Sequence, residues 1–136
     1  MDPTTAATPY LLLFRNTGPE NYAGLQADQR EQLIARWNSW FEGLASQGKV
    51  IDGRPLKDRA RVVSGAAGGR VVDGPFAETK EAVGGYAIVL AHSYEEATAI
   101  ARQHPGLERG MHIEVREMAD RCHLGILARG AGSSRS

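Results

Sequence analysis

The order of secondary structure along this chain is the feature that most limits its fold. Two segments, 28–48 and 94–104, have the apolar periodicity of helices, whereas the other apolar segments are short enough to be strands. The predicted order is therefore strand, helix, several strands, helix, strand. This order favours an α+β fold, in which an antiparallel sheet carries both helices on one face.

Both helices are marked at their ends. Asp28 and Glu31 have the spacing of a capping box at the start of the first helix, and Gly48 is suited to end it. Ser93 and Glu96 have the same spacing at the start of the second helix, and a proline follows its last residue. One face of the first helix is apolar and is expected to pack in the core, both tryptophans included: Leu33, Trp37, Trp40, Phe41 and Leu44.

The strands follow from short apolar runs bounded by turn residues. They are expected at residues 10–16 and 49–56, on either side of a glycine-rich connection at 65–69, and at 84–93 and 111–118. The glycine-rich connection lacks the Lys-Ser or Lys-Thr ending of a phosphate-binding loop and no helix follows it, so it is expected to be a hairpin tip. In the last strand, alternation places Met111, Ile113 and Val115 on one face and His112, Glu114 and Arg116 on the other.

Length and composition indicate one domain of 136 residues. Residues 1–9 and 129–136 are small and polar, so we expect a disordered start, a domain at residues 10–118 and a largely flexible C-terminal extension at 119–136. The 16 lysines and arginines balance the 16 aspartates and glutamates, which disfavours binding to nucleic acid. No apolar run is long enough for a membrane span or signal peptide, so a cytoplasmic protein is expected.

No metal or cofactor site is predicted. The only cysteine, Cys122, has His123 beside it, but a zinc site needs three or four ligands at defined spacing. The four histidines of the chain also lack the helical i, i+4 spacing of metal ligands.

The predicted sheet has one face that no helix covers. Because the strands are apolar and no third helix is predicted, the simplest cover for this face is a second copy of the chain. The sequence thus predicts a homodimer.

The connection between Asp73 and Gly84 is longer than a hairpin needs. It contains a proline and Phe76, and it ends at a glycine pair, 84–85, that could act as a hinge. We interpret it as a pocket wall or lid in which Phe76 is the anchor, Tyr86 faces the cleft and Lys80 meets an anionic group. The alternative is a purely structural role, in which the connection packs at a corner of the fold and seals the dimer interface.

Several side chains are candidates for acid–base chemistry. Asp73 could act as a general base, or its carboxylate could cap the turn before Gly74. His104 could exchange protons near neutral pH, or as a charged group complement the helix dipole. His112 and Glu114 should point the same way, into water or into the interior of a dimer. Arg54 is a weaker candidate for binding a carboxylate.

These residues include stretches that resemble a known family. "DGPFAETKE" at 73–81, "GGY" at 84–86 and the later "HIEVRE" are similar to the DGPF-motif branch of the YCII-related family, and the order of elements agrees from Tyr10 to Met118. The resemblance implies a ferredoxin-like dimeric α+β barrel, in which two sheets pack face to face and leave pockets in or beside the barrel.

The resemblance implies less about function, because most members of the family have no assigned activity. A histidine and an aspartate are proposed as a proton-transfer pair in some members, and one branch eliminates hydrogen chloride from a chlorinated ring-cleavage product. Here the first helix has no histidine where the wider family commonly has one. The first hypothesis is a cofactor-free lyase or isomerase that acts on a small organic acid by proton transfer. The alternative is a non-catalytic dimeric module that binds a metabolite or a regulatory partner, linked to transcription control through the family's association with alternative sigma factors.

Overall fold

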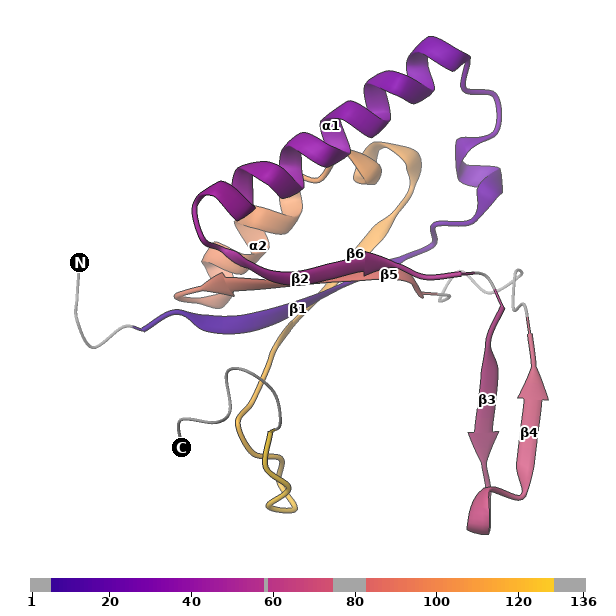
Figure 1. Cartoon of the computed structure of the whole chain (residues 1–136), viewed down its shortest axis with the longest axis vertical. Helices are drawn as coiled ribbons and strands as arrows, with labels where there is room; N and C mark the ends of the chain where they lie inside the picture. Colours follow the sequence, from indigo (N-terminus) through magenta and orange to yellow (C-terminus); the bar gives the residue numbers. More distant parts are fainter. Residues whose placement is uncertain (1–5, 58, 75–82, 129–136) are drawn as a thin grey trace.

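The computed structural model describes residues 6–57, 59–74 and 83–128. Its elements, with η for short 3₁₀ turns, are β1 Thr8–Arg15, η1 Pro19–Tyr22, α1 Ala27–Ser46, β2 Val50–Pro55, β3 Arg61–Ser64, η2 Ala66–Gly68, β4 Arg70–Asp73, β5 Val83–Ala91, α2 Tyr94–Arg102, η3 Pro105–Arg109 and β6 His112–Glu117. Four strands form one antiparallel sheet in the order β2-β5-β1-β6, and both helices lie over one of its faces (Figure 1). The predicted α+β, ferredoxin-like fold is confirmed. We call the face opposite the helices the open face.

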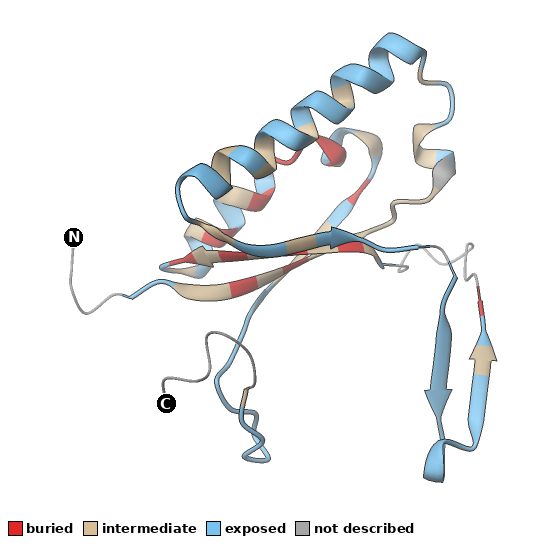
Figure 2. Cartoon of the chain, in the orientation of Figure 1, coloured by how far each residue is buried: buried red, intermediate tan, exposed pale blue. Residues whose placement is uncertain are grey.

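The core lies between the helices and the two central strands (Figure 2). Tyr10, Leu12 and Phe14 alternate along β1 toward the helices, and the alternate residues Ala87 and Val89 of β5 oppose them across the sheet. Leu12 and Val89 are completely buried, so water is excluded from the centre of the sheet on this face.

The first helix begins one residue before the expected start. The side chains that cap it are not the predicted Asp28 and Glu31. Its N-cap is Gln26, and Gln29 Oε1 accepts a hydrogen bond of 2.9 Å from the Gln26 backbone N–H. The capping box predicted at Asp28 is therefore wrong, because two glutamines with the same spacing, two residues earlier, make the reciprocal bonds. The predicted end is confirmed: Gly48 has φ +71°, and the N–H of Lys49 returns to the carbonyl of Leu44 at 2.9 Å.

The second helix starts as the sequence predicts. Ser93 Oγ accepts a 3.1 Å hydrogen bond from the Glu96 backbone N–H, while the Glu96 carboxylate accepts from the N–H of His92. Ala97 and Ala101 are buried against the sheet, so small residues let this helix approach closely.

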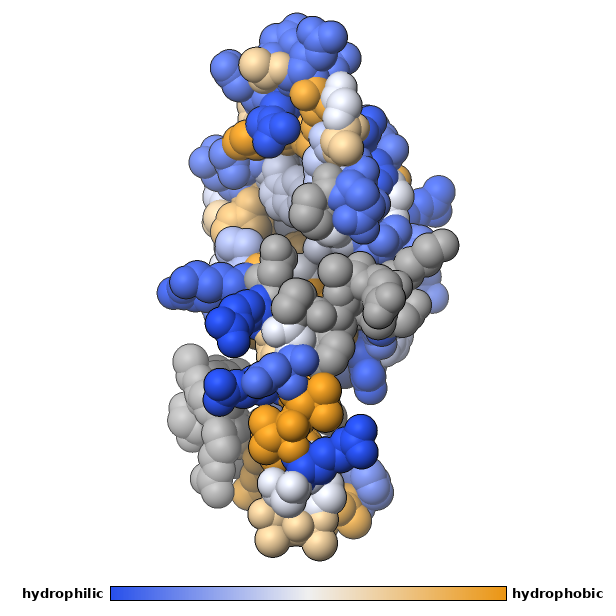
Figure 3. Space-filling model, turned by 90° about the vertical axis from the view of Figure 1, so that its right-hand side faces the viewer, coloured by the Kyte–Doolittle hydropathy of each residue, from blue (hydrophilic) through white to orange (hydrophobic). Residues whose placement is uncertain are grey.

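Strands β3 and β4 form a separate two-stranded ribbon, Arg61–Asp73, with the glycine-rich connection at its tip. The hairpin tip is as predicted, but the ribbon does not join the four-stranded sheet. It projects on the side of the sheet opposite the helices (Figure 1). Figure 3 shows hydrophobic side chains gathered over it. Three valines of the ribbon, Val62, Val63 and Val71, are 50%, 63% and 54% exposed.

Parts of the N-terminal segment and of the C-terminal extension are more structured than expected. Strand β1 already begins at Thr8, inside the segment expected to be disordered. After β6, residues 120–128 form a short hairpin, closed by hydrogen bonds from Cys122 N–H to the Ile126 carbonyl (2.9 Å) and from Ala128 N–H to the Asp120 carbonyl (2.6 Å). We call it the C-terminal hairpin.

The glycine pair 84–85 lies inside β5 and is not a loop hinge. At Gly84 an added Cβ would stand 1.7 Å from Thr17 Oγ1 and 2.9 Å from Thr17 Cβ, so the strand requires glycine for close approach. We expect Gly84→Ala to lower the free energy of unfolding by about 1–3 kcal/mol, measured by urea denaturation. Adding Thr17→Ala should recover part of this loss, because it removes the crowding hydroxyl; equal losses in both variants would contradict the explanation.

Candidate functional site

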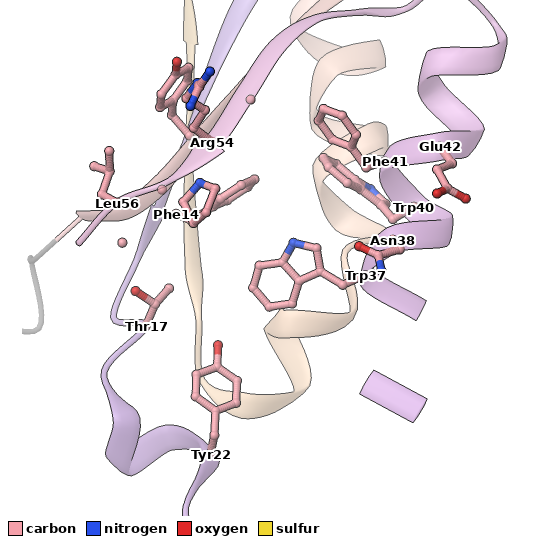
Figure 4. A pocket seen from close by; sticks show the side chains of 15 residues that line it. Phe14, Thr17, Tyr22, Trp37, Asn38, Trp40, Phe41, Glu42, Arg54 and Leu56 are labelled. Atoms are coloured by element: carbon pink, nitrogen blue, oxygen red, sulfur yellow. The ribbon is translucent and has the colours of Figure 1, made fainter. Parts of the chain in front are cut away.

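A cleft of about 570 Å³ opens between α1 and the ends of strands β1, β2 and β5 (Figure 4). Its lining residues are Phe14, Thr17, Tyr22, Trp37, Asn38, Trp40, Phe41, Glu42, Gly53, Arg54, Pro55, Leu56, Gly84, Gly85 and Tyr86. Helix α1 supplies mainly rings, and the strand side supplies the ring of Phe14 together with glycines.

Glycines keep the strand side of the cleft open. Gly53 of β2 pairs with the buried Ala87, so it lies on the face under the helices, and an added Cβ would stand 2.8 Å from the ring of Phe41. At Gly85 an added Cβ would stand 3.0 Å from the carbonyl oxygen of Arg54 and 3.4 Å from the ring of Phe14. Side chains at these two positions would fill the space that the cleft occupies.

The rings of the cleft hold one another in place. Phe14 meets Trp37 and Trp40 edge to face, with centroid separations of 6.3 and 6.2 Å, and the Trp40 and Phe41 centroids are 6.4 Å apart. Trp40 is also fixed by a 3.0 Å hydrogen bond from its indole N–H to the carbonyl of Ile100. These four rings, which we call the aromatic wall, are thus held in place and present flat aromatic surface to the cleft.

The hydroxyl groups of Tyr22 and Thr17 give the cleft a polar end (Figure 4). The phenol of Tyr22 points from η1 toward the space between Thr17 and Trp37 (Figure 4). Burial raises the pKa of Tyr22, with Arg109 acting in the opposite direction, so at neutral pH the phenol is an uncharged hydrogen-bond donor. Asn38 and Glu42 of α1 add an amide and a carboxylate to the lining.

His104 lies behind the aromatic wall. Its ring centroid is 4.3 Å from that of Trp37, 4.7 Å from that of Trp40 and 5.0 Å from that of Phe14, and only 2% of the residue is exposed. Nδ1 accepts a 2.9 Å hydrogen bond from the Gly106 N–H, so the proton of the neutral ring is on Nε2, which has no hydrogen-bond partner within the described residues.

Desolvation lowers the pKa of His104 to about 4. The predictions of a histidine that exchanges protons near neutral pH, or that is charged at the end of a helix, are therefore both wrong. The physical reason is the shell of rings from α1 and β1, which stabilises the neutral imidazole. His104 instead supports the cleft wall.

The backbone of Arg54 and Tyr86 lies at the cleft, but their side chains lie on the open face. The two residues are paired across β2 and β5, and the Arg54 side chain in Figure 4 leads away from the tryptophans. The Tyr86 hydroxyl donates a 2.7 Å hydrogen bond to Asp52, which lowers the pKa of Asp52 and raises that of Tyr86. Arg54 adds a further favourable charge beside the Asp52 carboxylate.

His112 and Glu114 also lie on the open face. They pair with Arg15 and Leu13 of β1, which confirms that they share one face of the last strand. Glu114 makes an ion pair with Arg15 and approaches Arg116 at 3.6 Å. The sheet itself therefore separates these two side chains from the aromatic cleft.

Asp73 lies at the base of the ribbon. Its carboxylate forms a 2.7 Å ion pair with Arg61, and both side chains are largely exposed. The following Gly74 donates to the carbonyl of Ala60 at 2.7 Å. Phe76 and Lys80, predicted as the anchor and the anion-binding residue of the loop, lie outside the described residues.

The two tryptophans pack against the core, as the sequence predicts, but they also line the cleft, which the sequence did not predict. A signal was present in the strands: glycine at 53 and at 85 stands where β2 and β5 face large aromatic residues. In the described part of the chain, no group of three histidine, cysteine, aspartate or glutamate side chains is placed to hold a metal ion. Nor is any of its helices both long and apolar enough to cross a membrane.

Comparison with known proteins gives one match, to a protein family. A family model described as the YCII-related domain matches residues 10–119, which is most of the chain. No curated protein was found to match. With its ferredoxin-like sheet and this match, the chain belongs to the family of proteins with a YCII-related domain.

Proposed function

We propose that the protein is a small-molecule binding domain whose ligand occupies the aromatic cleft. The observation that carries this proposal is a 570 Å³ space lined by Trp37, Trp40 and Phe41 of α1, by the ring of Phe14 from β1 and by glycine-containing strands. Ligand sites of this size are typically apolar with a few fixed polar groups. This corresponds to the metabolite-binding module considered from the sequence.

The chemistry of the lining favours a flat, largely apolar molecule with an oxygen acceptor. Aromatic walls bind rings by offset or edge-to-face stacking. The protonated Tyr22 phenol and the Thr17 hydroxyl can donate to an oxygen at the polar end. Glu42 disfavours an anionic group near its own position, because like charges repel. An aromatic ketone, aldehyde or phenol fits this set of groups better than a carboxylate.

A thermal-shift screen with matched pairs of neutral aromatic compounds and aromatic carboxylates tests the proposal. A ligand at a hundredfold excess over Kd stabilises the folded state by about 2.7 kcal/mol, which gives a measurable shift in Tm. We expect Trp37→Ala to abolish the shift and Trp37→Phe to retain most of it, because phenylalanine keeps a ring in the wall. Ligand-induced shifts of equal size in the wild type and Trp37→Ala would contradict the proposal.

A second candidate function, cofactor-free proton transfer on a small organic acid, is favoured by the open face. Acids and bases alternate there: the Asp52–Tyr86 pair lies beside Arg54, and Glu114 lies between Arg15 and Arg116. A homodimer with two open faces together would enclose these groups, with His112 among them, in a confined space where arginines can bind a carboxylate.

Asp73, Phe76 and Lys80 remain predictions for this second function. We expect His112→Ala and Glu114→Gln to abolish any lyase or isomerase turnover of small carboxylic acids while leaving ligand binding in the cleft unchanged. Turnover that is lost in Trp37→Ala but unchanged in these two variants would assign the chemistry to the cleft instead.

A further inference from the structure

The β3–β4 ribbon lacks a surface to pack on within the described part of the chain. Its two strands pair only with each other, and both faces carry valines, since Val62 pairs with Val72 and Val63 with Val71. Three of these valines are at least half exposed. A two-stranded ribbon on its own is at best marginally stable in water, so this one needs an apolar partner surface.

The C-terminal hairpin has the same character. Leu124, Ile126 and Leu127 are 75%, 66% and 47% exposed, although hydrogen bonds close the hairpin around them. Figure 1 shows it below the sheet, on the same side as the ribbon and opposite the helices. Two apolar projections therefore extend from one side of the molecule.

Between these projections lies the open face. Its centre is apolar and half-buried, with Leu11 and Leu13 from β1 paired with Ile88 and Tyr86 of β5. Four strands about 4.8 Å apart and about six residues long cover roughly 400 Å² in projection. A stable interface buries about 800 Å² on each partner, so the open face alone supplies about half of the required area.

We propose that the ribbon and the C-terminal hairpin are arms that clasp a second copy of this chain and supply the remaining interface. The inference rests on the homodimer proposed above and adds the contacts that hold it. A two-fold interface must be complementary to itself, and the open face meets this condition because its acids and arginines alternate around an apolar centre. A strongly charged partner such as nucleic acid would need one sign of charge.

Sedimentation equilibrium of the full chain tests the dimer and the arms separately. The wild type is expected at twice its 14.7 kDa. Val63→Asp with Val71→Asp should raise the dimer dissociation constant at least tenfold, because both charges would enter the apolar contact. The matched control is Ile34→Asp, at a helix residue that is 52% exposed on the other side of the sheet, and it should leave the constant unchanged.

The outcomes separate the two proposals. A monomeric wild type overturns the dimer and the arms together. A wild-type dimer that the ribbon variant does not weaken overturns the arms alone and leaves the open-face dimer standing. Circular dichroism of the ribbon variant checks that the four-stranded domain is still folded.

The native cysteine gives a second test that needs no substitution. Cys122 lies in the C-terminal hairpin and is exposed, and hydrogen bonds from the backbone around Ile126 and Leu124 lower the pKa of its thiol, which favours labelling. A benzophenone maleimide on Cys122 should give covalent dimers on irradiation. Irradiated samples that sediment as dimers but contain only uncrosslinked chains would overturn the role of the hairpin as an arm.

Discussion

Replacing Trp40 by alanine is expected to lower the free energy of unfolding by about 3–5 kcal/mol. The indole packs against the core beside Phe14 and His104, and its N–H donates to the carbonyl of Ile100 at 3.0 Å. The substitution leaves a cavity between α1 and α2 and removes one of the two hydrogen bonds to this carbonyl, which also accepts from the Gln103 N–H at 3.3 Å. Urea denaturation at pH 7 followed by circular dichroism measures the effect, and it should shift the midpoint without changing the slope.

Trp40→Phe separates the two contributions. The smaller ring keeps most of the apolar contact but loses the hydrogen bond to Ile100, so a loss of about 1–2 kcal/mol is expected. If Trp40→Ala cost no more than Trp40→Phe, the aromatic wall would contribute nothing to stability, and the rigid cleft described above would be refuted.

The pH dependence of stability should contain a large contribution from His104. In the folded protein its pKa is about 4, whereas in the unfolded chain it is near 6.5. Between these values the unfolded state binds the proton and the folded state does not, so the free energy of unfolding falls as the pH falls. The contribution is complete above pH 6.5 and is lost progressively down to pH 4, by up to about 3 kcal/mol.

His104→Asn is the matched control for this titration. The asparagine carbonyl can still accept the hydrogen bond from Gly106 N–H, but it does not bind a proton in this range. Other groups titrate equally in both proteins, so the stability advantage of the wild type should shrink between pH 6.5 and pH 4. A constant difference between the two proteins across that range would show that His104 is not held neutral by burial.

The arrangement of elements could be predicted from the sequence because local patterns determine it. The alternation in β1 and the spacing of Trp37, Trp40, Phe41 and Leu44 along α1 place apolar groups on one side of each element. The start of α1 was misplaced because the pattern offers two pairs of polar residues three positions apart, and only the backbone geometry decides between them.

The candidate site could be predicted only in part, because it depends on contacts between distant segments. The charge state of His104 is set by rings that lie more than 60 residues earlier in the chain. The candidates Asp73, His112 and Glu114 were chosen for their side-chain chemistry, whereas the structure places them outside the cleft, on the ribbon and on the open face. The aromatic residues that line the cleft looked like core residues, because packing and ligand binding use the same side chains.

The chain provides its own reporters for the central claim that the cleft binds a small molecule. It has two tryptophans, and both line the cleft. The indole N–H of Trp40 is bonded to the carbonyl of Ile100, whereas that of Trp37 has no hydrogen-bond partner among the described residues. Trp37 should therefore respond most strongly to an aromatic ligand.

The decisive measurement is a two-dimensional ¹H–¹⁵N spectrum of the indole N–H signals, assigned with Trp37→Phe and recorded while a stabilising compound from the thermal-shift screen is added. A saturable shift of the Trp37 signal, with a smaller shift of Trp40 and the same Kd for both, is predicted. A compound that raises Tm while neither indole signal moves would contradict the account, because the protein would then bind its ligand elsewhere.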